Sequence, residues 1–159
     1  MAMFQGKAAS RIEKVFSVES KFELSITSLR EPFIGIVDLI CQVEGARVIV
    51  DFKTAGCGYE EHEVVLSDQL TAYALADPEA TKVGLCVLVK TKDPAIQWHW
   101  ATRDAERFEE FLAKVRLVAD DIAAGKFYKR PGKHCAYCEY LSVCLGDQKK
   151  AQETLVKIT

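Results

Sequence analysis

Hydrophobic residues in the first third of this chain follow the patterns of β-strands. Apolar and polar positions alternate within residues 11–26, and residues 32–41 and 47–53 are runs of apolar and β-branched side chains. We therefore expect one or two strands in the first region and one strand in each of the others. Glu44 and Gly45 give a turn signal between the second and third regions, which predicts a hairpin.

Two later segments have the spacing of helices. Ser67 is a candidate N-cap for a helix that runs to about Ala76, where Asp77-Pro78 ends it. Thr102 or Asp104 caps a longer helix that ends near Gly125. The apolar stripe of this longer helix comprises Phe108, Phe111, Leu112, Val115, Val118 and Ile122.

Residues 82–90 and 96–100 predict two further strands, and residues 55–63 predict a loop rich in glycine and charge. The order of strands, helix, strands and helix indicates an α/β fold, with a mixed central β-sheet flanked by helices. A chain of 159 residues that is 49% hydrophobic suits one globular domain. We assign that domain to residues 1–159, with a core at 11–130 and a cysteine-bearing segment at 131–150.

Three charged residues interrupt the predicted hairpin. Side chains alternate along a strand, so Asp51 and Lys53 leave one face of it and Phe52 leaves the other. Pairing of the two strands brings Asp38 to the face of Asp51. Charged groups among apolar strands are costly to bury. Coordination of a divalent cation, which prefers oxygen ligands, would explain why carboxylates lie there. This equipment suits metal-assisted hydrolysis of a phosphodiester, although solvation is the usual fate of a carboxylate.

Four sequence features, taken in order, resemble the PD-(D/E)XK nucleases of the RecB-like branch. That branch includes the RecB and AddB nuclease domains and the CRISPR-associated RecB-like exonucleases. The resemblance covers residues 31–144 and implies a restriction-endonuclease-like core, with catalytic residues on the second and third core strands. The features are Gly35-x-x-Asp38, Asp51-x-Lys53, Gln69-x-x-x-Tyr73 and Cys135-x-x-Cys138-x5-Cys144.

The resemblance implies a site for Mg²⁺ or Mn²⁺. Asp38, Asp51 and the backbone carbonyl of Phe52 would hold one or two such ions. Lys53 would position or deprotonate the attacking water and stabilise charge on a phosphorane-like transition state. Glu19, on a predicted strand, is a candidate auxiliary ligand, and a surface strand residue is an equal alternative for it.

Gln69 and Tyr73 are four residues apart, so they share one face of the predicted helix. Together with the other features, they are candidates to donate hydrogen bonds to phosphates of the scissile strand, or to orient Lys53. The alternative is that Tyr73 is a half-buried packing residue and that Gln69 is solvated.

Three cysteines lie within ten residues of a turn-rich segment, which is more typical of ligands than of small core residues. The resemblance implies that Cys135, Cys138 and Cys144 supply three of the four thiolates of a [4Fe–4S] cluster. Three outcomes stay open for the fourth position. Cys57 could fill it, His134 could complete a Cys₃His site of the Zn²⁺ type, or the site could be incomplete.

In related nucleases an N-terminal helix segment carries the fourth cysteine and a histidine near the metal, and we expect this chain to lack that segment. No cysteine precedes Cys41, and no histidine precedes His62. We expect either a shortened domain or completion by a homo-oligomer or a partner protein. Cys41 and Cys86 lie in apolar strands and are expected in the core.

Composition and charge bear on the cellular location of the protein and on how it would bind nucleic acid. No apolar run approaches the ~20 residues that span a membrane, and a signal-peptide pattern is absent, so we expect a cytoplasmic protein with reduced cysteines. The net charge of −2 gives no global basic field. Nucleic acid would therefore bind at a local patch, helped by metal ions.

The favoured function is a metal-dependent deoxyribonuclease, either an exonuclease or a nuclease that acts on single strands. Its substrate would be single-stranded DNA or duplex ends in DNA repair, recombination, or mobile-element or phage DNA processing. The alternative is a non-catalytic nucleic-acid-binding or structural module that retains the fold. A third hypothesis is a cluster-bearing domain with a regulatory metal. The intact set of Asp38, Asp51 and Lys53 favours the enzyme.

Overall fold

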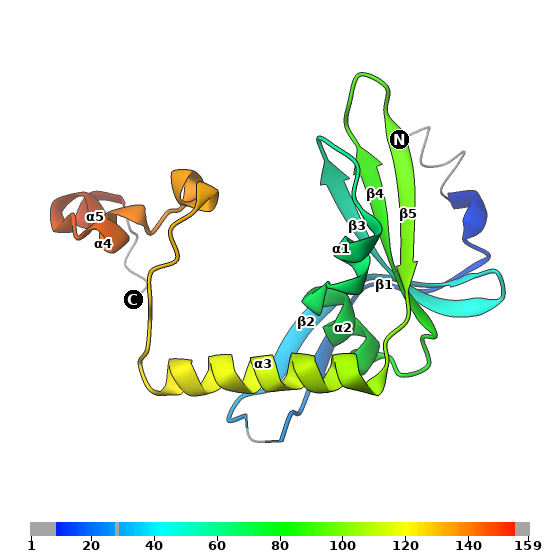
Figure 1. Cartoon of the computed structure of the whole chain (residues 1–159), viewed down its shortest axis with the longest axis horizontal. Helices are drawn as coiled ribbons and strands as arrows, with labels where there is room; N and C mark the ends of the chain where they lie inside the picture. Colours follow the sequence, from blue (N-terminus) through cyan, green and yellow to red (C-terminus); the bar gives the residue numbers. More distant parts are fainter. Residues whose placement is uncertain (1–8, 28, 155–159) are drawn as a thin grey trace. The chain divides into compact units, whose positions relative to one another are not determined.

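The computed structural model describes residues 9–27 and 29–154 (Figure 1). The chain divides into two compact units, one up to Ala119 and the other from Asp120 onwards. The assignment of all residues to a single domain stays a prediction. A short 3-10 helix, η2 (Ala9–Arg11), precedes the first strand.

The first unit is built on a five-stranded sheet in the order β1-β2-β3-β4-β5. Strands β3 and β4 are parallel, whereas the other three neighbouring pairs are antiparallel, so the sheet is mixed. Together with its flanking helices, it confirms the predicted α/β class. The strands are β1 (Lys14–Leu24), β2 (Phe33–Val43), β3 (Ala46–Ala55), β4 (Lys82–Val89) and β5 (Ala95–Ala101).

The two predicted helices are present as α2 (Asp68–Ala76) and α3 (Ala105–Ala123). The hydroxyl of Ser67 accepts the N–H of Leu70, which confirms the predicted N-cap of α2. At the start of α3, Asp104 Oδ1 accepts a backbone N–H of the first turn, so the cap is Asp104 rather than Thr102.

The short α-helix that follows β3 was not predicted. Residues 61–65 form α1 (Glu61–Val65), at the end of the segment expected to be a loop. The side chain of Glu63 accepts the backbone N–H of Glu60 at 2.8 Å, and the N–H of Glu63 donates to the carbonyl oxygen of Glu60, which stabilises this start. Val64 is 1% exposed and anchors the helix in the core. The charged residues that precede it are typical of a loop, which is why the sequence predicted none of this helix.

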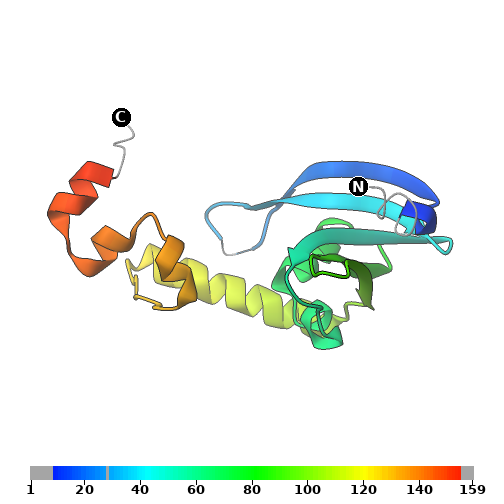
Figure 2. The same cartoon turned by 90° about the horizontal axis from the view of Figure 1, so that it is seen from above.

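The apolar core lies on both faces of the sheet. The first cluster contains residues of α1 and α2 together with Val37, Ile49 and Val83, and Phe108 of α3 packs against it. The second cluster contains Leu39 and other strand residues, with partly buried tryptophans of β5 against them. Figure 2 shows this unit turned by 90°, with β1 and β2 forming its upper layer. Helices α1 and α2 thus contribute buried residues to one face of the sheet, and we call it the helical face.

The second unit holds three short helices and the cysteine motif. Gly146 follows α4 with a φ of 79°, and its N–H donates to the carbonyl oxygens of Ser142 and Val143. Within the described ranges, no helix is long and apolar enough to cross a membrane. The helices are η3 (Lys133–Tyr137), α4 (Leu141–Leu145) and α5 (Gln148–Thr154).

Candidate functional site

Strand β3 presents Asp51 and Lys53 toward the helical face of the sheet. Ile49 belongs to the cluster on that face, whereas Val50 and Phe52 pack on the other. The predicted alternation is therefore confirmed. The side chain of Asp51 is only 1% exposed, while that of Lys53 is 35% exposed. A buried carboxylate and a half-exposed ammonium thus stand next to each other on one strand.

Asp38 joins this pair from the neighbouring strand. Its Oδ2 accepts the backbone N–H of Phe52 at 3.0 Å. The β2–β3 ladder ends at the pair Leu39–Val50, one residue before this contact. Beyond that pair the Asp38 carboxylate, instead of a strand carbonyl, satisfies the donor on β3. Asp38 is near enough for its charge to raise the pKa of Asp51.

A chain of polar contacts links β3 to α2. Lys53 Nζ lies 2.7 Å from Asp51 Oδ2 and donates to Gln69 Oε1 at 2.9 Å. Gln69 Nε2 in turn donates to the hydroxyl of Tyr73 at 2.7 Å. Gln69 and Tyr73 therefore share one face of α2, as their spacing predicts, and this face meets Lys53. The ring of Tyr73 is buried, at 5% exposure, and its hydroxyl is part of the polar chain.

Burial controls the electrostatics of the site. The pKa of Asp51 is raised, first because burial penalises its charged form and also because Asp38 is near; the close positive charge of Lys53 opposes this. The pKa of Tyr73 is raised too, mainly by burial, with the two carboxylates adding to the effect. Asp51 Oδ2 is at ion-pair distance from Lys53, yet among the described residues it accepts no well-aligned hydrogen bond.

This donor set fits a divalent cation. A buried carboxylate oxygen without an aligned hydrogen bond is costly unless another positive partner completes its coordination. The carboxylates of Asp38 and Asp51 are hard oxygen ligands of the kind that Mg²⁺ and Mn²⁺ prefer, and so is the backbone carbonyl of Phe52, the residue after Asp51 on β3. In residues 9–27 and 29–154, no three His, Cys, Asp or Glu side chains gather as a metal site. Water and substrate oxygens would supply the remaining positions, as is usual for Mg²⁺.

Glu19 lies in β1, and its side chain is exposed. Its backbone has a φ of 49°, in the left-handed region that a non-glycine residue rarely adopts. The residues on either side of it pair with Leu39 and Val37, which places Glu19 across from Asp38. Its suggested role as an auxiliary ligand stays a prediction.

The motif cysteines all lie in the second unit. Cys135 and Cys144 are half-buried, whereas Cys138 is exposed. The thiol of Cys135 accepts the N–H of Gly132 at 3.4 Å, within its own turn. The part of the chain that the structure describes brings no three metal-binding side chains together here either. The arrangement is three free thiols in one unit, without an assembled ligand set.

The remaining candidates have separate environments. His134 Nε2 lies 3.0 Å from the carbonyl oxygen of Arg130, and Cys57 is exposed in the segment after β3. Cys41 and Cys86 are 0% exposed, which confirms their prediction as core residues. Burial raises the pKa of the Cys41 thiol to about 11 and that of Cys86 to about 12, so neither is a ready thiolate.

Arg103 was missed by the sequence analysis. Its guanidinium donates to the carbonyl oxygens of Val64 and Ser67 and to the hydroxyl of Thr71. These contacts tie the end of α1 to the start of α2, immediately before Gln69. A single arginine between a strand and a helix carries no sequence pattern that could have identified this role.

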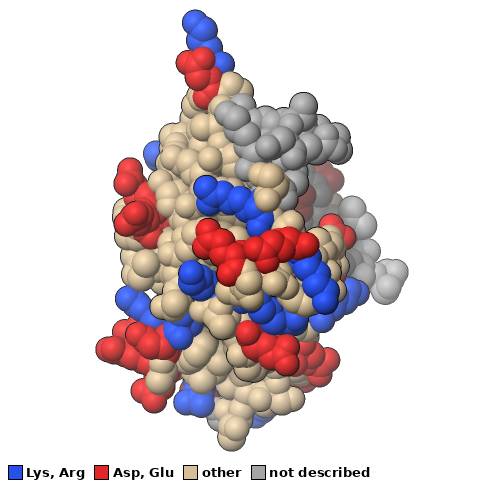
Figure 3. All heavy atoms as spheres, turned by 90° about the vertical axis from the view of Figure 1, so that its right-hand side faces the viewer, with Lys and Arg blue, Asp and Glu red and all other residues tan. Residues whose placement is uncertain are grey.

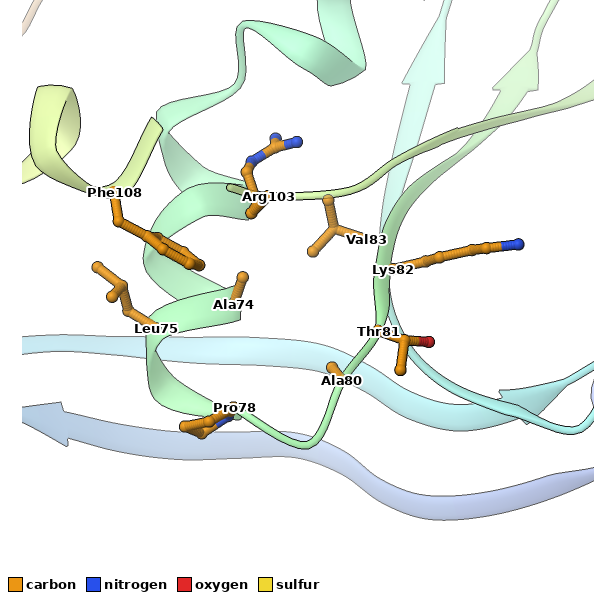
Figure 4. Close-up of a pocket in the computed structure, with 9 residues that line it drawn as sticks. All are labelled: Ala74, Leu75, Pro78, Ala80, Thr81, Lys82, Val83, Arg103 and Phe108. Atoms are coloured by element: carbon orange, nitrogen blue, oxygen red, sulfur yellow. The ribbon is translucent and has the colours of Figure 1, made fainter. Parts of the chain in front are cut away.

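A cavity of about 220 Å³ lies at the other end of α2 (Figure 4). Lys82 and Val83 at the start of β4 border it, and Val83 pairs with Ile49. Asp51 and Lys53 pair further along β4, so the cavity and the carboxylates occupy different ends of the strand pair. The cavity is lined by Ala74, Leu75, Pro78, Ala80, Thr81, Lys82, Val83, Arg103 and Phe108.

Surface charge is mixed in sign. On the face drawn in Figure 3, lysine and arginine side chains are interspersed with aspartate and glutamate. This agrees with the net charge of −2, and that face has no continuous basic field.

A mixed sheet with two aspartates and a lysine on its central hairpin, faced by a glutamine-bearing helix, defines the restriction-endonuclease-like class of nuclease folds. The chain belongs to the PD-(D/E)XK nuclease superfamily, whose family model matches residues 2–145. No curated protein sequence matches the chain.

Two solved structures are similar to this fold. The crystal structure of a protein designated SSO0001 has a TM-score of 0.53 at 18% identity over 80% of this chain. A protein of Eubacterium rectale named "Putative exonuclease" has a TM-score of 0.57 at 12% identity over 99% of this chain. The chain spans 59% of the length of each of these two proteins. At these identities the similarity is one of fold.

Proposed function

We propose that this chain is a metal-dependent deoxyribonuclease of the RecB-like branch of its superfamily. The observation that carries the proposal is the continuous polar chain from buried Asp51 through Lys53 and Gln69 to Tyr73, with Asp38 beside it. A non-catalytic module has no need to maintain a buried carboxylate with a raised pKa next to a lysine.

The proposed substrate is DNA, either single-stranded or at duplex ends. The fold similarity to a protein named an exonuclease supports cutting from ends. The mixed surface charge supports recognition at a local site instead of along a broad basic surface. The biological setting within the proposal is DNA repair, recombination, or mobile-element or phage DNA processing.

Asp38 and Asp51, with the backbone carbonyl of Phe52, would hold Mg²⁺ or Mn²⁺. A bound cation of this kind polarises a phosphoryl oxygen and lowers the pKa of water. Glu19 stays a candidate for an additional ligand. Two carboxylates rather than three would leave positions for water and phosphate oxygens, as hydrolysis requires.

Lys53 is placed to act on the substrate itself. Its ammonium group is paired with Asp51 and aligned by Gln69, which favours donation to a phosphoryl oxygen or to the attacking water. In the proposed reaction, the water oxygen bonds to phosphorus and the bond from phosphorus to the 3′ oxygen breaks. The proton passes to that 3′ oxygen. The products are a 5′-phosphate and a 3′-hydroxyl.

The proposal includes a second metal group at Cys135, Cys138 and Cys144. The spacing of the three thiols and their common place in the second unit support a [4Fe–4S] cluster or Zn²⁺. The test is absorbance near 400 nm in freshly purified anaerobic protein, with zinc measured in the same sample. Cys138→Ser should remove the signal, whereas Cys57→Ser should remove it only if Cys57 is the fourth ligand.

A cytoplasmic location is also part of the proposal. All six cysteines are free thiols, which suits a reducing compartment. Completion of the domain by a second copy or by a partner protein can be tested by light scattering of the purified chain.

The main experiment measures degradation of end-labelled single- and double-stranded DNA with Mg²⁺ or Mn²⁺. Lys53→Ala should abolish cutting, EDTA should do the same, and Lys90→Ala, at an exposed lysine just past β4, should cut like the wild type. If folded, metal-loaded wild-type protein binds DNA but does not cut it, the binding-module alternative replaces the enzyme.

A further inference from the structure

The alternation of side chains along β2 is broken at Asp38. Val37 packs in the cluster on the helical face, whereas Leu39 packs in the cluster on the other face. Two residues separated by one position of a regular strand share a face, so a regular β2 would keep Val37 and Leu39 together. The change of face therefore falls between Val37 and Leu39, where the candidate metal ligand stands.

The alternation is regular after this point. From Leu39 onwards, Leu39 and Cys41 face one cluster and Ile40 faces the other. If that pattern is extended back by one residue, Asp38 lies on the helical face together with Ile40. A strand that continued the pattern from Val37 would instead turn Asp38 to the opposite face, away from Asp51.

The backbone across from Asp38 explains how the sheet accommodates this change. Val18 pairs with Leu39 and Ser20 pairs with Val37, so Glu19 is the residue opposite Asp38. Glu19 has a φ of 49° inside a strand, where φ is ordinarily strongly negative. A left-handed residue interrupts the pleat of its own strand, and the strand paired with it must follow.

This conformation is unfavourable for a glutamate. A non-glycine residue in the left-handed region is strained, and such strain persists where surrounding structure enforces it. Elsewhere in the described chain, positive φ at a non-glycine residue is found only at Glu44, with a φ of 51°. Glu44 lies with Gly45 in the turn between β2 and β3, an ordinary place for such a conformation.

We propose that Glu19 is a positioning residue, whose left-handed backbone sets the change of face that turns Asp38 toward Asp51. It acts through its main chain and not through its exposed carboxylate. The proposal rests on the proposed metal site. It distinguishes two roles for Glu19: a metal ligand, through its carboxylate, and a positioning residue, through its backbone conformation.

Three substitutions distinguish these roles. Glu19→Gly removes the carboxylate and favours the left-handed conformation, and Glu19→Gln removes only the charge. Glu19→Val removes the carboxylate and opposes the conformation, because a β-branched residue with positive φ is an outlier. Glu44→Val is the matched control, since it places the same side chain at a similar φ away from Asp38.

The readout is Mn²⁺ affinity of the full chain by titration calorimetry, with thermal unfolding in EDTA as a separate measurement of stability. We expect Glu19→Gly and Glu19→Gln to bind Mn²⁺ like the wild type, and Glu19→Val to bind about 10–100-fold more weakly, as other losses of ligand support do. Glu44→Val should leave the Mn²⁺ affinity unchanged. If Glu19→Val does not fold, Glu19→Ala takes its place, with a smaller expected loss in the same direction.

Two results would overturn the proposal. Wild-type Mn²⁺ affinity in Glu19→Val would show that the conformation does not matter, and loss of affinity in both Glu19→Gly and Glu19→Gln would make the carboxylate a ligand. If the wild type itself binds no Mn²⁺, the proposed function fails. The positioning role is then decided by crystal structures of the wild type and Glu19→Val, which either keep or lose the hydrogen bond from Phe52 N–H to Asp38.

Discussion

Lys53 on β3 and Gln69 on α2 are joined by a hydrogen bond of 2.9 Å between Nζ and Oε1. This contact fixes the half-exposed ammonium group of Lys53 to a helix, so that its position does not depend on its strand alone. Lys53 Nζ is also 2.7 Å from Asp51 Oδ2, so the ammonium group is held by two partners. Beyond these two contacts with described residues, the ammonium has a third N–H that could serve substrate or water.

Removal of this support should slow cleavage more than it weakens the fold. We expect Gln69→Leu to lower kcat on labelled DNA by about 10–100-fold, because a hydrogen bond to a charged group is worth about 1.5–3 kcal/mol. Tyr73→Phe removes only the hydroxyl that Gln69 contacts, so its loss should be several-fold smaller. Steady-state kinetics of the two variants test this order, and an equal effect of both would contradict a role of Gln69 in aligning Lys53.

Asp51 should be destabilising in the absence of metal. Burial raises its pKa above the ordinary 3.8, so between that value and the raised one the folded chain holds a proton that the unfolded chain has released. Stability therefore falls as pH rises through this window and stays lower above it. We expect Asp51→Asn in EDTA at pH 7 to melt a few degrees higher than the wild type, where about 1 kcal/mol corresponds to about 2–4 °C.

The same variant should gain no stability from Mn²⁺ and should not cut DNA, which separates stability from function. Asp68→Asn is the control, because Asp68 is half-exposed and paired with Lys114 at the surface, where such a pair is worth about 0–1 kcal/mol. A lower melting temperature of Asp51→Asn in EDTA would mean that the ion pair with Lys53 outweighs the cost of burial.

The raised pKa of Asp51 also predicts the pH dependence of metal binding. The cation needs the ionised carboxylate, so the proton competes for the same oxygen. We expect Mn²⁺ affinity to fall as pH is lowered toward the raised pKa, at a pH higher than an ordinary aspartate would require. Calorimetric titration over a pH series checks this; an affinity that is unchanged until the ordinary aspartate range would argue against a buried ligand.

The hairpin and its charged face could be read from the sequence, because both depend on local rules. Alternation places Asp51 and Lys53 together whatever the remaining structure is, and a four-residue spacing does the same for Gln69 and Tyr73. That Lys53 meets Gln69 follows from the packing of α2 on the sheet, and only the family resemblance suggested it.

Other features have no local signature. The left-handed Glu19 opposes ordinary residue preferences, so propensity predicts an unbroken strand there. The contacts of Arg103 join residues more than 30 positions away, which no short pattern encodes. Such departures from local preference are expected where a fold holds a functional site.

Gly35 supports the site from a distance. A Cβ added there would lie 2.5 Å from the ring of Phe22, and that ring packs edge-on against Tyr73 with centroids 5.8 Å apart. We expect Gly35→Ala to displace Phe22 and to lower the free energy of unfolding by about 1–3 kcal/mol, the usual cost of overpacking. Urea unfolding measures this change, and DNA degradation shows whether the disturbance reaches Tyr73.

A second substitution tests the mechanism. Gly35→Ala combined with Phe22→Leu should be more stable than the sum of the two single effects, because the smaller side chain makes room for the methyl group. Gly56→Ala is the control, since an added Cβ there meets no atom within 4 Å. Additive effects of the pair would show that Phe22 is not what the methyl group displaces.

Arg103 should stabilise the junction of α1 and α2 through its three contacts with Val64, Ser67 and Thr71. Burial lowers its pKa, with Arg107 adding to the effect, yet the group remains a cation at neutral pH. Arg103→Ala leaves partly buried carbonyls without their donor, so we expect a loss of about 1–3 kcal/mol in the free energy of unfolding. Arg103→Lys should recover little, because one ammonium cannot reproduce the planar donor geometry.

Arg107→Ala is the matched control for Arg103→Ala. Arg107 lies one turn further along, and its pair with Glu110 at 3.0 Å is exposed, so its removal should cost no more than about 0.5 kcal/mol. Kinetics on labelled DNA, measured well below the melting temperatures of both variants, then separate an effect on the stability of the fold from an effect on the position of Gln69. A lower kcat in Arg103→Ala alone would mean that the start of α2 must be held for Gln69 to reach Lys53. Unchanged kcat in a destabilised variant would restrict Arg103 to the fold, and equal stabilities of the two variants would contradict its role at the junction.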